Sequence, residues 1–345
     1  MKRPLLFFLQ IMTLTVLSAA TSEQPILFTG NNRGLLGTCA CEIPAGGLPR
    51  IATLSDSLGK ELIRIGCGNQ FFSRMPKPYE DQILAQDQAR LQAEILSELR
   101  FDVINIGEYD LCYGLRFLQS LERDFGLPLI SANLRDAEGN SPFPHYRIVS
   151  RNGIRIAFTG ICTRSDGFNF KVADPLPALT ELINLDLHRE ADFVVLLADA
   201  SLKGLKPFLD LHPGIDFTVF AKEAYATPLS QATESGSCAH IGFQGQYAGY
   251  LQLFSRDPDA FWKDLTAENH RLHFAEKLLN TADTERGALL RQYRRVRNNA
   301  KNVLQQESLK AGRYYFWNLI SMTQEIRERP DILETIQNFD RREKK

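Results

Sequence analysis

The chain has 345 residues, of which 44% are hydrophobic and 23% are charged, and its formal net charge is −1. These values exclude a collagen-like or wholly disordered chain. Six cysteines are also too few for a small disulfide-rich scaffold. The near-neutral charge gives no support for nucleic-acid binding. The length allows one large domain or two of ordinary size.

The N-terminal 20 residues have the organisation of a secretory signal peptide. Lys2 and Arg3 form a positive segment, Leu5–Leu17 is mostly apolar, and Ser18–Ala20 supplies small residues for cleavage. The apolar segment is short for a transmembrane helix, which needs about 20 apolar residues. We therefore expect an exported protein, periplasmic or secreted, that starts near Thr21 and has no membrane span after cleavage.

Short apolar segments rich in β-branched residues recur between residues 25 and 255 and predict strands. They cover residues 26–29, 62–65, 103–106, 129–131, 154–160, 193–197, 217–220 and 250–254. Apolar residues at helical spacing predict a helix over Tyr79–Leu99. Asn152 and Gly153 separate two strand-like segments and predict a tight hairpin turn. This order indicates an α/β protein with mixed sheets.

Residues 257–345 are expected to form a helical, basic C-terminal extension. Apolar or small residues recur at positions 275, 279, 282, 289, 293, 296, 300 and 303, and this spacing predicts one long helix. A second apolar helix is predicted over Tyr314–Ile326, and the two could form a hairpin or lie along the sheet. Residues 270–345 carry sixteen Lys and Arg against ten Asp and Glu. These helices could therefore bind an acidic protein partner, or their charges could simply be solvated.

Several segments resemble, in order, the motifs of calcineurin-like metallophosphoesterases, and are most similar to the secreted 5′-nucleotidase and UDP-sugar hydrolase branch. They are the first strand and turn at 26–34, Gly-Gly-Leu-Pro-Arg at 46–50, the block at 101–114, the strands at 128–133, 153–160 and 214–220, and the closing strand at 245–251. The resemblance implies a four-layer α/β/β/α sandwich. We then expect a signal peptide at 1–20, a sandwich domain at 21–256 and the extension at 257–345.

The resemblance also implies a site for two divalent metals that activate water and bind the phosphate. Such a site needs carboxylates, imidazoles and amide oxygens as ligands. The corresponding positions of this chain hold Asn31, Arg33, Asn69, Glu108, Tyr109, Asp199, Lys222 and Ala224. None is a histidine, and Arg33 and Lys222 place positive charges where metals should lie. We therefore expect no metal cofactor and a catalytically degenerate protein, or pseudoenzyme.

Two hypotheses describe what could occupy the site instead. In the first, Arg33 and Lys222 pair with the carboxylates of Glu108, Asp110 and Asp199 and replace the metal charges. The other interpretation of these residues is that each is an ordinary exposed charge.

The second hypothesis concerns sulfur, because five cysteines lie near strand ends on the same face. They are Cys39, Cys41, Cys67, Cys112 and Cys162. In an exported protein, a disulfide from the Cys39/Cys41 loop to a neighbour is the leading prediction, since Cys-x-Cys rarely closes on itself. A thiolate metal site and buried, hydrophobic cysteines are the alternatives.

These observations predict an exported binding or assembly protein, with the C-terminal helices as the candidate interface for a protein partner. One alternative is a periplasmic phosphoesterase or 5′-nucleotidase-like hydrolase with an atypical site. The other is a protein that binds phosphate or a nucleotide through Arg33 and Lys222 without hydrolysis.

Overall fold

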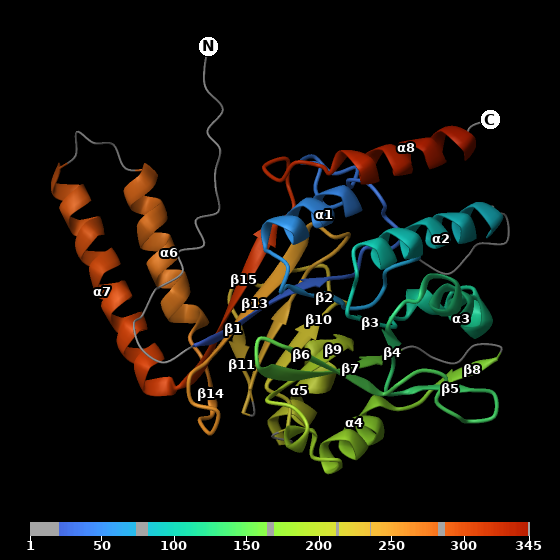
Figure 1. Ribbon diagram of the computed structural model, residues 1–345, viewed down its shortest axis with the longest axis horizontal. Coiled ribbons are helices and arrows are strands. Elements are labelled where there is room, and N and C mark those ends of the chain that lie inside the picture. The colour runs from blue at the N-terminus through green and yellow to red at the C-terminus, as the bar shows by residue number, and fades with distance from the viewer. Residues whose placement is uncertain are drawn as a thin grey trace.

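The computed structural model describes residues 21–73, 82–163, 169–211, 214–234, 236–281 and 287–343. The predicted signal peptide lies outside these residues. The described chain forms two mixed sheets packed face to face, with helices on both outer surfaces (Figure 1). The predicted four-layer α/β/β/α sandwich is therefore confirmed. No helix in the described part combines the length and apolar character needed to cross a bilayer.

The larger sheet has seven strands in the order β14-β15-β13-β1-β2-β3-β4. Their bounds are Ser22–Thr29 (β1), Ile63–Gly66 (β2), Val103–Asn105 (β3), Leu129–Ile130 (β4), Tyr247–Ser255 (β13), Trp262–Asp264 (β14) and Arg313–Ser321 (β15). Strands β1 to β4 are parallel, whereas β13 is antiparallel to both β1 and β15. The carboxyl ends of β1, β2 and β3 therefore share one edge of the sheet.

The second sheet has six strands in the order β11-β12-β10-β9-β7-β6. Their bounds are Tyr146–Arg151 (β6), Ile154–Cys162 (β7), Phe193–Asp199 (β9), Phe217–Phe220 (β10), Gln231–Ala232 (β11) and Ser237–His240 (β12). The strands β7, β9, β10 and β12 are parallel. Asn152 and Gly153 join β6 to β7 with φ values of 51° and 76°, as the predicted turn requires. A small separate sheet pairs β5 (Leu134–Asp136) with β8 (Phe170–Val172).

An apolar layer fills the space between the two large sheets. Phe28 on β1 and Trp317 on β15 meet Phe158, Phe193 and Phe217 of the opposite sheet, and each is at most 1% exposed. Strands buried on both faces read as nearly continuous apolar segments, which explains why the strand predictions from sequence are confirmed.

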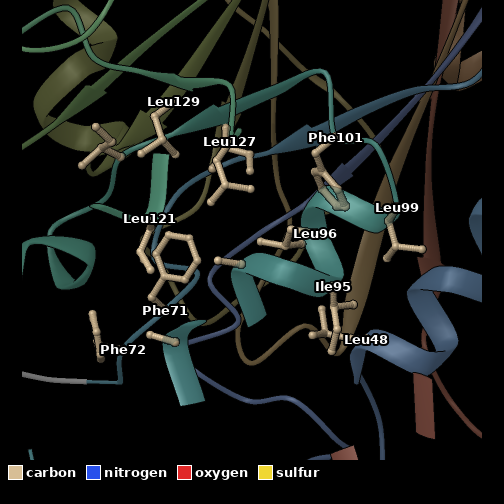
Figure 2. Close-up of a cluster of buried hydrophobic side chains, with 14 of the residues drawn as sticks. Leu48, Phe71, Phe72, Ile95, Leu96, Leu99, Phe101, Leu121, Leu127 and Leu129 are labelled. Carbon is tan, nitrogen blue, oxygen red and sulfur yellow. The ribbon is translucent and has the colours of Figure 1, made fainter. Parts of the chain in front are cut away.

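Helices cover the outer faces of both sheets. The seven-stranded sheet carries α1 (Leu48–Ser57), α2 (Gln82–Glu98), α3 (Gly114–Phe125) and α8 (Pro330–Glu343), and the six-stranded sheet carries α4 (Pro175–Asn184) and α5 (Leu202–Leu211). Figure 2 shows part of the buried cluster between these helices and the seven-stranded sheet, which includes Leu48, Phe71, Ile95, Leu96 and Leu121. The predicted helix over Tyr79–Leu99 corresponds to α2, and residues 79–81 lie outside the described part.

The helix predicted over Tyr314–Ile326 is wrong, because this segment contains strand β15. Its side chains alternate, so that Tyr315 and Trp317 face the other sheet while Tyr314 and Phe316 face away from it. Aromatic residues favour strands, and β13 supplies a partner along the whole length of β15. An apolar segment this short does not distinguish a strand from a buried helix by periodicity alone.

The single long helix predicted over 275–303 is also wrong. The chain instead forms α6 (Thr266–Thr281) and α7 (Gly287–Ala311), which lie side by side as a hairpin (Figure 1). At the base of the hairpin, Leu272 and Leu304 pack with Tyr314 of β15. The chain after residue 256 therefore contributes β14, β15 and α8 to the sandwich, in addition to a projecting hairpin.

Replacing Trp317 should test the role of β15. Its ring lies against Gly249, where an added Cβ would be 2.1 Å from the indole, and its Nε1 donates to the Thr227 carbonyl at 3.0 Å. We expect Trp317→Ala to reduce the free energy of unfolding by about 3–5 kcal/mol in urea titrations, because it opens a cavity between the sheets. The control Phe261→Ala changes a side chain that is 95% exposed and should have little effect. Equal losses in both variants would contradict the fold.

Candidate functional site at the carboxyl ends of the strands

The predicted site residues converge where the parallel strands end. Asn31 follows β1, Asn69 follows β2, Glu108 follows β3, Asp199 ends β9 and Lys222 follows β10. Because parallel strands bring their carboxyl ends to one edge, side chains far apart in the sequence become neighbours there.

Backbone hydrogen bonds tie the loop after β1 to the loop after β2. The N–H of Asn31 donates to the Gly68 carbonyl and the N–H of Arg33 donates to the Asn69 carbonyl, both at 2.8 Å. Asn31, Arg33 and Asn69 have φ values of 51°, 53° and 53°. Asn tolerates this left-handed region, but Arg rarely adopts it. The loop therefore fixes the direction of Arg33 at a cost in backbone energy.

The side chain of Asp199 lies at the centre of the cluster and has no exposed surface. Its Oδ1 accepts a hydrogen bond from Asn69 Nδ2 at 2.9 Å, and its Oδ2 accepts one from the Glu108 N–H at 2.6 Å. Burial raises the pKa of Asp199, whereas the Glu108 N–H and the charge of Lys222 act to lower it. Loops from both sheets thus meet at one carboxyl group.

The ammonium group of Lys222 lies beside this carboxyl group. Its Nζ is 3.0 Å from Glu108 Oε2 and 3.0 Å from Thr163 Oγ1. Burial acts to lower the pKa of Lys222, but the charges of Asp199 and Glu108 outweigh it, and the pKa is raised above its usual value. Lys222 is therefore a cation, as the first hypothesis requires, and it pairs with Glu108.

Arg33 does not form an ion pair with any of the carboxylates that the first hypothesis assigns to it. Its guanidinium carbon lies 4.7 Å from the ring centroids of both Tyr109 and Phe243, and its Nε donates to Asn31 Oδ1 at 2.9 Å. Such contacts are cation–π interactions. Among the described residues, no ion pair joins Arg33 to Glu108, Asp110 or Asp199. Arg33 thus lies between two aromatic rings rather than among the carboxylates.

Asp110 does not take part in the Lys222–Glu108 ion pair, because its carboxyl oxygens accept hydrogen bonds from the backbone. Its Oδ1 accepts from the Phe71 N–H and its Oδ2 from the Gly107 N–H, both at 2.9 Å. Burial raises the pKa of Asp110 to about 7, although the hydrogen bonds from these two N–H groups act to lower it. Asp110 therefore connects the loops after β2 and β3 and pairs with neither Lys222 nor Arg33.

Two further buried polar side chains lie near the site: Asn105, for which the sequence predicts no role, and His240, a candidate that the sequence offers without further ligands. Asn105, at the end of β3, donates through Nδ2 to the carbonyls of Ile161 and Leu197 in the other sheet, each at 3.2 Å. His240, at the end of β12, has Nε2 3.0 Å from the Tyr225 hydroxyl. A polar residue that ends an apolar strand is the sequence signal that could have identified both.

No family model and no curated protein matches the chain. Solved structures do match it. A 5′-nucleotidase precursor from Thermus thermophilus aligns with 93% of this chain at 14% identity and a TM-score of 0.64. The calcineurin-like phosphoesterase YfkN from Bacillus subtilis aligns with 94% at 15% identity and a TM-score of 0.64. The NAD nucleotidase NadN from Haemophilus influenzae aligns with 69% at 16% identity and a TM-score of 0.57.

The chain has the calcineurin-like metallophosphoesterase fold. It spans 98% of the YfkN structure, but only 59% of the Thermus thermophilus protein and 48% of NadN. At these identities the likeness concerns the fold, and the activities named for these proteins belong to them.

The metallophosphoesterase fold implies two divalent metals, but the residues at this site do not fit such a pair. The oxygens that could bind metals already accept hydrogen bonds from the protein: Asn31 Oδ1 from Arg33, Asn69 Oδ1 from the Tyr109 N–H, and both Asp199 oxygens. Glu108 forms an ion pair with Lys222. Ala224 is exposed, and its side chain has no atom that could bind a metal. Among the described residues, no group of three or more His, Cys, Asp or Glu could hold a metal ion.

The cysteines pair differently from the prediction. Cys39 and Cys41 form a disulfide with each other, so the predicted bond from their loop to a neighbour is wrong. The loop turns at Ala40 and brings the two Cα atoms within 5.3 Å, a usual separation for a disulfide. Gln246 Nε2 lies 3.3 Å from Cys41 Sγ.

The other three predicted cysteines are buried in the metallophosphoesterase core. Cys67 packs between the sheets, while Cys112 and Cys162 pack under the helices of the seven-stranded sheet. Burial raises the pKa of the Cys67 thiol. The alternative that they act as small hydrophobic side chains fits this placement.

Proposed function

We propose that this protein is an exported pseudoenzyme: a metallophosphoesterase fold that does not hydrolyse phosphate esters and that acts by binding or assembly. The observation that carries this proposal is the ion pair between Lys222 Nζ and Glu108 Oε2 at 3.0 Å, beside the buried Asp199. This ammonium group supports the proposal because the motif resemblance assigns Lys222 to a metal-ligand position. The apolar N-terminal segment supports export.

The surrounding contacts support the loss of chemistry. Tyr109 stands where the resemblance places an imidazole, and its ring packs on the Arg33 guanidinium instead. Neither Arg nor protonated Lys has a lone pair for a metal. The Asp199 oxygens accept hydrogen bonds from the protein and would lose them on binding a cation. An atypical hydrolase would therefore have to open this network first.

The other alternative, phosphate or nucleotide binding at Arg33 and Lys222, has less support. Arg33 lies between two aromatic rings, and Lys222 already contacts Glu108 and Thr163. Both cations thus have partners, and an incoming phosphate would compete with them.

The hairpin α6–α7 is the surface we propose for a protein partner. It projects from the sandwich, and α7 carries six Lys and Arg but only one acidic residue, Glu307 (Figure 1). Glu307 pairs with Lys263 and Lys310, so the arginines nearer the start of α7 have no acidic neighbour on their own helix. Phe274 on α6 and Val296 on α7 are 56% and 46% exposed. Basic and apolar side chains together suit an acidic protein with apolar contacts at its centre.

A phosphatase assay on the secreted form of the chain tests the loss of catalysis. We expect no turnover of a generic phosphate monoester or diester above the buffer rate with added Mn²⁺ or Zn²⁺, because Lys222 excludes the metals. Asp199→Asn should give the same result. Turnover that Asp199→Asn abolishes, and that the exposed substitution Arg116→Gln leaves intact, would overturn the proposal.

Charge reversal on α7 tests the partner surface. In cells that export the protein, chemical cross-linking should join Lys301 to an acidic partner, and Arg294→Glu with Arg295→Glu should abolish these cross-links through like-charge repulsion. The control reverses Arg116 and Arg123, two exposed arginines on α3, and should leave the cross-links unchanged. Cross-links that persist after reversal of α7 would contradict the proposal.

A further inference from the structure

The disulfide between Cys39 and Cys41 lies in a loop that the fold holds in place without it. Cys39 N–H donates to the Ala45 carbonyl and Gly46 N–H to the Met322 carbonyl, both at 2.8 Å. Arg50 Nη1 donates to the Pro44 carbonyl at 2.9 Å. Because these contacts come from outside the pair, the two sulfurs would stay close together after reduction.

The spacing of the two cysteines gives the disulfide little structural value. A disulfide stabilises a protein mainly by restricting the unfolded chain, and the effect grows with the size of the loop that it closes. Cys39 and Cys41 are two positions apart, so their bond closes a very small loop. Stability therefore does not explain why the pair is present.

The two sulfurs differ in their surroundings in a way that suits thiol–disulfide exchange. Cys39 is 3% exposed, whereas Cys41 is partly exposed and lies between the exposed residues Ala40 and Glu42. Ile43, two positions further, is 63% exposed and adds an apolar contact for an incoming protein. One accessible and one shielded sulfur is the arrangement in which a partner attacks the first and releases the second.

Gln246 supplies a donor to the more accessible sulfur. Its Nε2 lies 3.3 Å from Cys41 Sγ and 3.9 Å from Cys39 Sγ. A hydrogen bond to the charged form of a titratable group favours that form, so this amide would stabilise a Cys41 thiolate. Phe243, in the same turn, covers Arg33, so the turn connects the disulfide loop to the candidate site.

We propose that Cys39 and Cys41 form a redox site that exchanges disulfides with a dithiol on another protein. A partner thiolate attacks Cys41 Sγ, the Cys39–Cys41 bond breaks, and Cys39 leaves as a thiolate that takes a proton. The partner's second thiolate then attacks the partner's first sulfur, which is bonded to Cys41 in the mixed disulfide. Cys41 leaves as a thiolate that takes a proton. Two electrons pass from the partner to this pair, and the partner becomes a disulfide. In the reverse direction a partner disulfide accepts two electrons and becomes a dithiol, and Cys39 and Cys41 return to the disulfide.

Trapping with glutathione tests the assignment on the secreted chain. The Cys39→Ser variant should form a mixed disulfide with oxidised glutathione at Cys41, at least about tenfold faster than Cys41→Ser forms one at Cys39, because only Cys41 is accessible. Intact-protein and peptide mass spectrometry measure both. Thermal unfolding of each variant should match that of the unmodified sequence, which separates reactivity from misfolding. Equal rates in the two variants would overturn the proposal.

The equilibrium of the pair gives a second readout. The Cys39–Cys41 pair should become reduced in glutathione buffers. The ratio of reduced to oxidised glutathione needed should match the ratio that reduces the disulfides of exchange-active proteins. Gln246→Leu should slow trapping at Cys41 several-fold near neutral pH, and Gln337→Leu on the exposed side of α8 should not. A pair that stays oxidised in a large excess of reduced glutathione is a purely structural disulfide, and that result would also overturn the proposal.

Discussion

The side chain of Asp199 has no exposed surface, so the protein must itself supply hydrogen-bond partners for both carboxyl oxygens. Asn69 and the backbone of Glu108 supply them, and Lys222 adds a positive charge nearby. These three residues belong to the loops after β2, β3 and β10, which come from both sheets. Satisfying one buried group thus fixes the loops at the whole edge of the sandwich. The same contacts occupy the oxygens that a metal would need.

The charged side chains at this edge therefore have their partners within the protein. Lys222 and Glu108 pair directly, and the guanidinium of Arg33 lies between Tyr109 and Phe243. The chain keeps the metallophosphoesterase fold, and under the proposed function these internal charges take the place of the two metals. Two surfaces outside this edge remain for other roles: the basic hairpin α6–α7 and the loop that carries the Cys39–Cys41 disulfide.

The strand pattern predicted mixed sheets, and it is confirmed because the central strands are apolar on both faces. The four-layer sandwich and the grouping of Asn69, Glu108, Asp199 and Lys222 followed from the resemblance to metallophosphoesterase motifs. Neither could identify the partner of Arg33, since Phe243 lies more than 200 positions away along the chain. The aromatic segment of β15 was mistaken for a helix, because only pairing with β13 distinguishes the two structures.

The disulfide illustrates a different limit. Spacing alone argued against a bond between Cys39 and Cys41, but backbone hydrogen bonds to the carbonyls of Ala45 and Met322 shape the loop, and these depend on the folded chain. Composition likewise misjudged the C-terminal segment, whose basic charge belongs mainly to α7. Local patterns thus located the candidate residues, while their pairing depended on tertiary contacts.

A calorimetric titration of the metal-free protein with Mn²⁺ and Zn²⁺ tests the central claim most directly. If Lys222 and the hydrogen bonds to Asp199 replace the two metals, the protein should show no stoichiometric binding of two ions, and Asp199→Asn should not change the titration. Binding of two ions per chain that Asp199→Asn abolishes would contradict the account.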